Sequence, residues 1–245
     1  MSEPRFRSDI AVRKVMSAGD DQTFAEAAWV VDPETPWDDR RTGPTDVGRV
    51  LKAMLKGRHG TPFEHGLMTV YVEAPVVVWW EWTRHRFMSL GCPDLGFNLE
   101  SGRYRVLDGV FYLPPERRPC KEPDGFKPMR PELEFDIAAH EEAVGGLKAT
   151  YFRAWSDYQL SVSRGVSREV ARMGMPFGLY YAGYVSANPR TWLQFFSLRR
   201  SDPRAAVATF PQWEIQKADE ACESLFARQW PATYDLFNEL GRVAP

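Results

Sequence analysis

The segment Thr83–Tyr104 most constrains how this chain can fold, because it sets several arginines between two strongly apolar runs. The run VVVWWEW precedes it, and VFYLP follows it closely. Arginines rooted between buried segments are held still, and a guanidinium matches phosphate or carboxylate oxygens two at a time. The small residues Ser101 and Gly102 would let a ligand approach the backbone. The segment therefore predicts an anion-binding site; the alternative is a solvated basic surface.

Composition narrows the class of ligand and partner. A net charge of −2 argues against a general polyanion binder, so the clustered arginines suit a small anion rather than nucleic acid. The three cysteines are widely spaced and form neither a disulfide framework nor a zinc pattern, which is typical of reduced thiols. The sequence shows no signal peptide and no apolar run of membrane-spanning length. We therefore expect a cytoplasmic protein without a membrane partner.

Hydrophobic periodicity predicts a mixture of strands and helices. The predicted strands are 9–17, 67–73 and 178–187, and the predicted helices are 45–57, 75–86, 131–163, 167–176, 187–200 and 211–230. The helix from Pro131 to Ser163 would bury a stripe of Leu133, Ile137, Val144, Leu147, Tyr151, Trp155 and Leu160. Residues 32–44 are expected to form a loop.

Three of the four histidines, His59, His65 and His85, lie close together in sequence. With Glu64 they suggest a metal site, and a metal-dependent hydrolase is one alternative function. However, His59 and His65 are six residues apart across a Thr-Pro turn, whereas zinc hydrolases place two histidines at i, i+4 on a helix. A polar turn that hydrogen-bonds a ligand or a neighbouring chain is the preferred interpretation. On the helix that follows, Glu81 is predicted to share a face with His85 and the arginine before it.

A second polar set lies in the last third of the chain. Arg168 and Arg172 are at i, i+4 in one predicted helix, and so are Arg190 and Gln194 in another. Asn188 is a natural cap for the second helix, and Arg199 lies near its end. This set could hold a phosphorylated or heterocyclic ligand, so a catalytically silent nucleotide- or RNA-binding module is another alternative.

Four blocks of sequence occur in a characteristic order. RHR at 84–86 is followed, after a spacer, by SGRY at 101–104. The other blocks are HGTPFEH at 59–65, REVAR at 168–172, and N-x-R at 188–190 leading to FxxLR at 195–199 and QWEI at 212–215. Over roughly residues 10–235, these blocks resemble the flavin-dependent thymidylate synthases.

The resemblance implies a mixed α/β fold of the α+β type, with an antiparallel-rich sheet and flanking helices. It also implies a homotetramer with active sites shared between subunits. We expect one domain over residues 1–245, with an inserted loop at about 87–100 and a Pro-rich connection at 114–131. The implied reaction is reductive methylation of deoxyuridylate (dUMP) at C5 without an enzyme thiolate. Its carbon comes from 5,10-methylenetetrahydrofolate, and its hydride comes from FAD that NADPH reduces.

The resemblance also implies residue roles. Carried over by position, the FAD contacts are Thr61, Glu64, Arg84, His85, Arg86, Asn188, Arg190 and Gln194. The nucleotide contacts are Glu81, Arg84, Glu100, Ser101, Gly102, Arg103, Arg172 and Arg199. Arg199 is the expected catalytic residue, because a fixed cation beside the uracil ring raises the electron density at C5.

The chain departs from the family pattern beside the expected nucleotide. The spacer between RHR and Ser101 is fourteen residues, about twice the usual length in the family. Glu81 stands where the family commonly has Gln, and Glu100 where it tends to have Gln or Leu. An ionised carboxylate accepts hydrogen bonds, and the ribose 2′-hydroxyl is a donor that deoxyribose lacks. These departures predict that both UMP and dUMP are methylated, as in family members that act on uridylate in nucleoside-antibiotic pathways.

Overall fold

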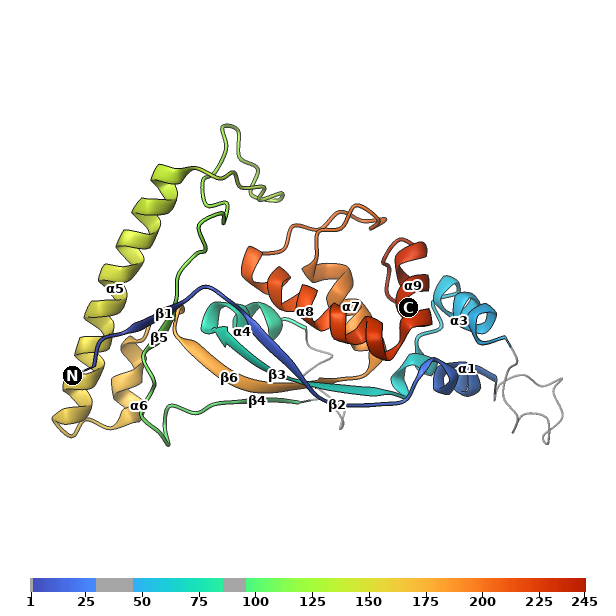
Figure 1. The fold of residues 1–245 in the computed structure, drawn as a ribbon, viewed down its shortest axis with the longest axis horizontal. Helices are drawn as coiled ribbons and strands as arrows, with labels where there is room; N and C mark the ends of the chain where they lie inside the picture. The colour runs from blue at the N-terminus through green and yellow to red at the C-terminus, as the bar shows by residue number, and fades with distance from the viewer. Residues whose placement is uncertain (1, 30–45, 86–95) are drawn as a thin grey trace. The chain divides into compact units, whose positions relative to one another are not determined.

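The computed structural model describes residues 2–29, 46–85 and 96–245 (Figure 1). Its contacts divide the chain into two compact units, each made of several segments. The first unit comprises Met1–Ala11, Glu73–Trp82 and Leu99–Gly183, and the second comprises Val12–Val72, Thr83–Asn98 and Tyr184–Pro245. The single domain expected from the sequence stays a prediction.

The main sheet has four strands in the order β2 (Ala11–Ala18), β3 (Leu67–Pro75), β6 (Tyr180–Ala187) and β4 (Phe97–Leu99). β3 and β6 each contribute residues to both units. Two short strands, β1 (Arg5–Arg7) and β5 (Val110–Tyr112), pair in parallel. The three predicted strands are therefore present, and the predicted mixed fold with an antiparallel-rich sheet and flanking helices is confirmed.

An aromatic cluster forms the core of the first unit. The long helix α5 (Ile137–Ser163) buries Tyr151, Trp155 and Tyr158, and Phe111 of β5 stacks on Tyr151. Gly109 approaches this cluster with φ +61°, and a Cβ there would lie 2.5 Å from the Trp155 ring. Only glycine fits at this position, for both its backbone conformation and its closeness to Trp155.

Two features of α5 differ from the sequence prediction. The helix begins at Ile137 rather than Pro131, because the Asp136 carboxylate accepts a hydrogen bond from the Ala139 amide (2.9 Å) and caps it there. The predicted buried stripe is also partly wrong, since Ile137 is 65% exposed and Leu160 is 37% exposed. The stripe follows the aromatic residues of the last turns instead.

Two shorter helices of the first unit end earlier than predicted. α4 spans Val76–Trp82, so His85 and the arginine before it lie beyond the helix, and the predicted shared face with Glu81 is wrong. Valine and tryptophan are moderate helix formers at best, and burial of Trp79 and Trp82 rather than propensity supports this helix. The predicted helix 167–176 is split into α6 (Arg168–Ala171) and the 3₁₀ turn η3 (Arg172–Gly174). Pro176 favours an extended conformation for the residue before it, which stops the helix.

The second unit contains α1 (Asp21–Trp29), α3 (Val47–Lys56), η1 (Thr61–Glu64), α7 (Pro189–Arg199), α8 (Trp213–Gln229) and α9 (Pro231–Glu239). α3 agrees with the sequence: Asp46 caps its first turn and Gly57 follows its last residue. α7 and α8 also agree, whereas α1 and α9 were not predicted. α7 packs against both η1 and α8. Its buried residues include Trp192 and Phe196, which stack on each other.

Some predictions fall on parts of the chain that the structure does not describe. The predicted loop 32–44 lies wholly outside the described residues. So do residues 87–95, which are most of the predicted inserted loop. Residues 114–131 contain turns and isolated bridges but no helix or strand, and the Pro-rich connection stays a prediction. No helix among the described residues is long and apolar enough to cross a membrane.

Candidate functional site

In the second unit, an ion pair joins two of the sequence blocks. Arg190 Nη1, in the first turn of α7, lies 2.6 Å from Glu64 Oε1 at the end of η1. Gly60 precedes η1 and lies directly against this arginine: a Cβ built on it would be 2.6 Å from Arg190 Cζ. The absence of a side chain at Gly60 is therefore what lets Arg190 reach Glu64.

Replacing Gly60 with alanine is expected to weaken FAD binding by about tenfold, because the added methyl displaces the Arg190 guanidinium from its position. The measurement is a titration of flavin-free protein with FAD. Gly48→Ala is the matched control, since a Cβ there meets nothing closer than 3.8 Å. Equal FAD affinity in both variants would remove Arg190 from the flavin site.

His85 is buried beside α7. It is 8% exposed, and its ring packs edge-on against Phe195 with 5.0 Å between the ring centroids. Burial, and then the positive charge of Arg199, lower the pKa of His85 from 6.5 to about 4. Its Nε2 has no hydrogen-bond partner among the described residues. The imidazole is therefore neutral at neutral pH and has an unused buried nitrogen.

α7 carries the remaining expected flavin contacts of the second unit. Asn188 caps the helix by accepting a hydrogen bond from the Thr191 amide (2.9 Å), and Gln194 is half-buried one turn after Arg190. Arg199 is the last residue of α7. The structure thus gathers most of the predicted flavin residues around η1 and α7. Thr61 begins η1, Arg84 precedes His85, and Arg86 lies outside the described residues.

In the first unit, four of the expected nucleotide contacts lie at or beside a tight turn: Ser101, Gly102, Arg103 and Arg172. Arg84 and Arg199 belong to the second unit. Gly102 is buried against Arg172, with 3.4 Å from a built Cβ to Arg172 Cδ. Arg103 forms an ion pair with Glu169 (3.4 Å), and its amide lies 3.4 Å from the Ser101 hydroxyl. Two arginine side chains, a hydroxyl and a backbone amide therefore lie at or beside this turn, a combination that is typical of phosphate sites.

The Glu100 carboxylate is held on both sides. Arg105 Nε lies 3.1 Å from its Oε1, and the Ala182 amide of β6 lies 3.4 Å from its Oε2. The Glu100 amide in turn donates to the Ala182 carbonyl (2.8 Å).

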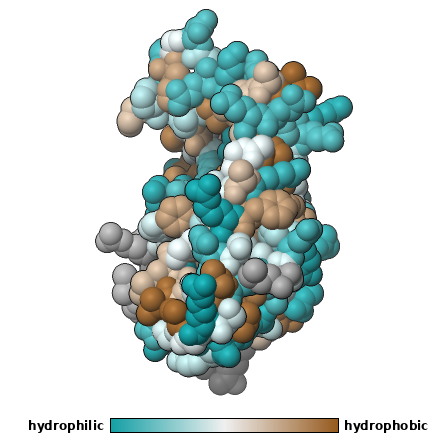
Figure 2. Space-filling view, turned by 90° about the vertical axis from the view of Figure 1, so that its left-hand side faces the viewer, coloured by the Kyte–Doolittle hydropathy of each residue, from teal (hydrophilic) through white to brown (hydrophobic). Residues whose placement is uncertain are grey.

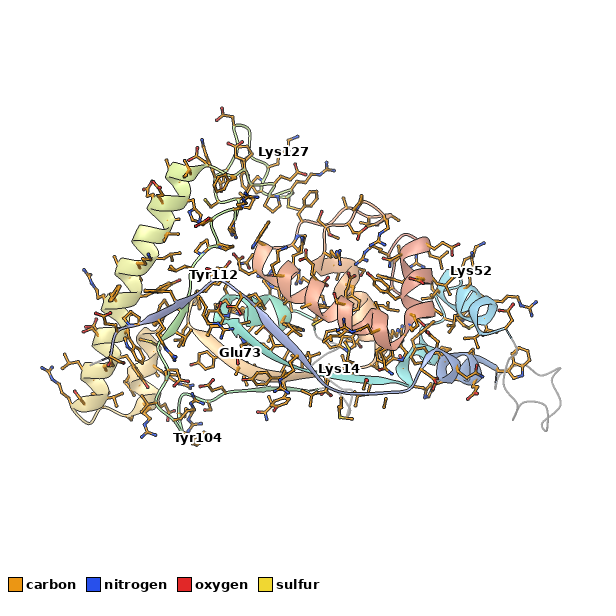
Figure 3. All side chains as sticks on the ribbon, viewed as in Figure 1. Lys14, Lys52, Glu73, Tyr104, Tyr112 and Lys127 are labelled. Atoms are coloured by element: carbon orange, nitrogen blue, oxygen red, sulfur yellow. The ribbon has the colours of Figure 1, made fainter. Side chains whose placement is uncertain are left out.

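Two other polar residues of the first unit lie near this turn or on α4. Arg168 Nη1 donates to the carbonyl of Tyr104 (2.8 Å), and the exposed Tyr104 is labelled in Figure 3. Glu81 is half-buried in the last turn of α4.

Tyr181 is a candidate site residue that the sequence did not reveal. Its hydroxyl hydrogen-bonds the Arg172 side chain, and Glu100 lies close enough to act on it through charge. Burial raises the pKa of Tyr181, and Arg172 acts in the opposite direction. The sequence signal is weak, because a tyrosine in a strand is ordinarily only a core residue.

We expect Tyr181→Phe to raise the KM for the nucleotide about fivefold with little change in kcat, because Arg172 loses a hydrogen bond that holds it; fivefold corresponds to roughly 1 kcal/mol. Steady-state kinetics measures the two constants separately. Tyr180→Phe is the matched control, because the Tyr180 hydroxyl donates to the Asp9 carbonyl instead (2.6 Å). A KM increase of the same size in the control would contradict this role for Tyr181.

The histidine-rich turn does not assemble a metal site in the part of the chain that is described. No group of three or more His, Cys, Asp or Glu side chains is placed to hold an ion there. Glu64, the expected carboxylate ligand of such a site, is paired with Arg190. The hydrolase alternative is therefore not favoured.

The family model described as "Thymidylate synthase complementing protein" matches residues 14–232, which include all four sequence blocks. The chain belongs to this family. It is 38% identical to the flavin-dependent thymidylate synthase of Streptomyces coelicolor over 240 residues, covering 98% of this chain and 95% of the relative. It is 36% identical to that of Streptomyces avermitilis over 245 residues, covering 99% and 96%.

Solved structures agree with this family. The crystal structure of the UMP/dUMP methylase PolB from Streptomyces cacaoi bound with 5-Br UMP matches 100% of both chains, with a TM-score of 0.87 and 31% identity. The same protein bound with 5-Br dUMP matches with a TM-score of 0.87 and 32% identity, covering 98% of this chain and 100% of that one. This member of the thymidylate synthase complementing protein family is therefore a flavin-dependent methyltransferase.

The residues of this family member fit a flavin dinucleotide. The Arg190 guanidinium, held by Glu64, is a group that could bind a diphosphate, and the Gln194 amide is one that could pair with a heterocycle. The buried His85 Nε2, which no described residue satisfies, is the kind of atom that a bound ligand pairs with. These groups come from separate sequence blocks and lie on or beside α7.

Proposed function

We propose that this chain methylates C5 of the uracil ring in dUMP and UMP. The carbon donor is 5,10-methylenetetrahydrofolate, and NADPH reduces the FAD. The observation that carries the proposal is the meeting of distant sequence blocks: Glu64 of one block binds Arg190 of another, and Gly102 of a third lies against Arg172 of a fourth. The names of the relatives support the flavin, and the ligands of PolB support the two nucleotides.

The turn of the first unit binds the nucleotide phosphate. Arg103 and Arg172 offer guanidinium forks, and the Ser101 hydroxyl and the Gly102 amide add neutral donors. Because Glu169 and Tyr181 hold these two arginines, little side-chain entropy is lost when the phosphate binds. This part of the site fixes the substrate but takes no part in bond making.

Arg199 activates the pyrimidine. C5 of uracil is a poor nucleophile, and a permanent cation beside O2, O4 or an ionised N3 stabilises the negative charge that develops as C5 attacks carbon. The reduced flavin supplies the hydride. Because the pKa of His85 is lowered to about 4, the imidazole is uncharged at neutral pH, and Arg199 carries the dominant charge at this position.

A homotetramer with shared active sites is part of the proposal. Several large apolar side chains of the first unit are exposed, including Met129 (90%), Met173 (76%) and Ile137 (65%). Hydrophobic side chains also reach the surface in several separate groups on the face drawn in Figure 2. Burial of these side chains against another subunit would remove them from water and so stabilise the tetramer.

The decisive experiment for the function combines an absorbance spectrum with a product assay. Purified protein should show flavin absorbance and should form 5-methylated nucleotide when given methylenetetrahydrofolate, NADPH and dUMP or UMP. A colourless protein with stoichiometric zinc would instead indicate a hydrolase. Colourless, metal-free protein with salt-sensitive RNA binding would indicate a silent binding module.

We expect both UMP and dUMP to be methylated, because Glu100 places a fixed carboxylate acceptor directly beside the phosphate-binding turn. Parallel kinetics on the two nucleotides, in wild type and in Glu81→Gln and Glu100→Gln, measure the preference. Loss of a 2′-hydroxyl acceptor should raise the KM for UMP more than that for dUMP. If wild type neither binds nor methylates UMP, the enzyme is specific for dUMP and the sugar prediction is wrong.

A further inference from the structure

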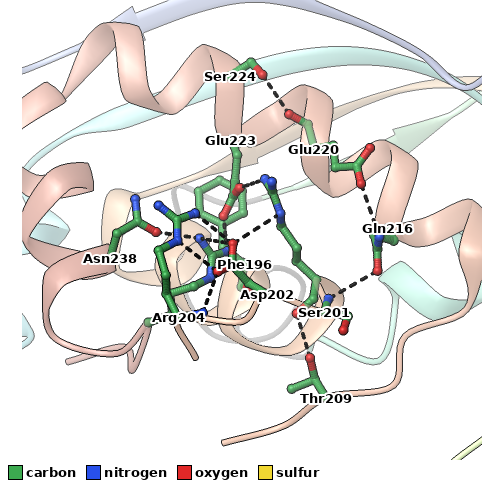
Figure 4. A network of polar contacts seen from close by, with 12 residues as sticks. Phe196, Ser201, Asp202, Arg204, Thr209, Gln216, Glu220, Glu223, Ser224 and Asn238 are labelled. Carbon is green, nitrogen blue, oxygen red and sulfur yellow. Dashed lines mark hydrogen bonds and ion pairs between the residues drawn. The ribbon is translucent and has the colours of Figure 1, made fainter. Parts of the chain in front are cut away.

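The end of α7 is fixed by a buried ion bridge that the proposed chemistry does not use. Glu223 on α8 is 1% exposed and binds two arginines at once, Arg200 and Arg242 (Figure 4). Arg242 is 2% exposed and lies after α9. We call Arg200, Glu223 and Arg242 the Glu223 bridge.

Both arginines of the bridge hold the last turn of α7, where Arg199 is located. Arg200 is the residue immediately after Arg199 and forms the C-cap of α7. Arg242 Nη2 also donates to the carbonyl of Phe196 (3.3 Å), three residues before Arg199. The last carbonyls of a helix lack partners within the helix, so this hydrogen bond caps the turn that carries Arg199.

Further acidic residues lie beside the Glu223 bridge. Asp202 lies 3.7 Å from both Arg200 and Arg242, and supplies the second negative charge. Asp219, one turn before Glu223 on α8, is fully buried, and neither of its oxygens has a partner among the described residues. Burial, and then the charge of Glu223, raise the pKa of Asp219 well above its ordinary value, whereas the charges of Arg242 and Arg200 lower it.

We infer that the Glu223 bridge positions Arg199 for pyrimidine activation. The argument from geometry is that two contacts, at Phe196 before Arg199 and at Arg200 after it, fix the backbone from which the Arg199 side chain extends. A charge that stabilises a transition state loses much of its effect when it is displaced by about 1 Å. Arg200 is therefore a positioning residue, acting through Arg199. The inference rests on the function proposed above.

A double-mutant cycle tests this inference, with Arg200→Met and Arg199→Lys as its two changes. Arg200 is the accessible end of the bridge, with 27% of its side chain exposed, so its replacement should leave the protein folded. With Arg199 present, Arg200→Met should lower kcat about tenfold, with the dissociation constants for FAD and dUMP unchanged. In the Arg199→Lys background, Arg200→Met should lower kcat by less than about twofold, because the effects of residues that act as one unit are not additive.

The matched control is Arg204→Met. Arg204 lies in the same loop and pairs with Asp202 (2.7 Å), but it makes no contact with Glu223 among the contacts described. It should keep the wild-type kcat. An equal loss of kcat for Arg200→Met in both backgrounds, or an equal loss in Arg204→Met, would overturn the inference and leave the bridge a structural feature.

Misfolding of a variant and failure of the proposed function would give different results from failure of the positioning role. If Arg200→Met fails to fold, as shown by its thermal melt, the cycle is run with Arg200→Lys. That variant keeps one bond to Glu223 and should give about a threefold loss that again disappears beside Arg199→Lys. If wild type forms no methylated nucleotide, the proposed function fails. If wild type is active but the cycle is additive, only the positioning role fails.

Discussion

Replacing Arg199 with lysine is expected to lower the rate of methylation by at least about tenfold while FAD remains bound. Tenfold corresponds to roughly 1.4 kcal/mol of activation free energy. Lysine keeps the positive charge but loses the planar fork and its delocalised donors, so charge at the uracil oxygens is stabilised less well. Arg199 is the last residue of α7, and its charge lowers the pKa of His85, so it acts on one of the expected flavin contacts.

Single-turnover and steady-state rates, with flavin absorbance as the measure of loading, separate chemistry from cofactor binding. Arg228→Lys is the matched control, because Arg228 is in the last turn of α8 in the same unit and is exposed. Turnover equal to wild type in Arg199→Lys would assign pyrimidine activation to another cation.

The second large effect is on stability at acid pH, and it comes from His85. Its folded pKa, about 4, lies below its ordinary value of 6.5, so folding favours the neutral form. The stabilisation is therefore complete above pH 6.5 and is lost as the pH falls from 6.5 towards 4. Each pH unit in that window costs up to about 1.4 kcal/mol, so the total loss approaches about 3 kcal/mol.

Denaturant unfolding of the flavin-free protein at several pH values measures this loss. His85→Gln should be less stable than wild type at pH 7.5, but its stability should fall less steeply between pH 6.5 and 4. His65→Gln, which changes an exposed histidine, should keep the wild-type slope. If His85→Gln retains the full slope, other groups account for the acid sensitivity.

Local signals in the sequence predicted the elements that local chemistry determines. The limits of α3 and the start of α7 follow from Asp46, Gly57 and Asn188, and all three do what their residue types favour. The predictions failed where tertiary contacts decide. α4 ends at Trp82 although the sequence is compatible with a longer helix. α5 begins after its N-cap Asp136, although Pro131 is also a residue that favours a helix start.

The same distinction holds for the site. Residues in compact motifs, such as the RHR and SGRY blocks, could be identified from sequence because their spacing is short. The partners that hold them could not. Tyr181 reaches Arg172 from a strand, and Glu223 reaches the end of α7 from another helix. No periodicity connects such residues, because their relation exists only in three dimensions.

The interleaving of the two units bears on how the chain acquires its structure. The chain passes between the units five times, after residues 11, 72, 82, 98 and 183, so neither unit is one continuous stretch. Assembling either unit therefore requires contacts between segments far apart in the sequence, and topologies rich in distant contacts fold slowly. During synthesis, the first unit cannot be completed before Gly183 has left the ribosome, and no contiguous fragment contains either unit alone. We expect acquisition of the active fold to be a late, cooperative event.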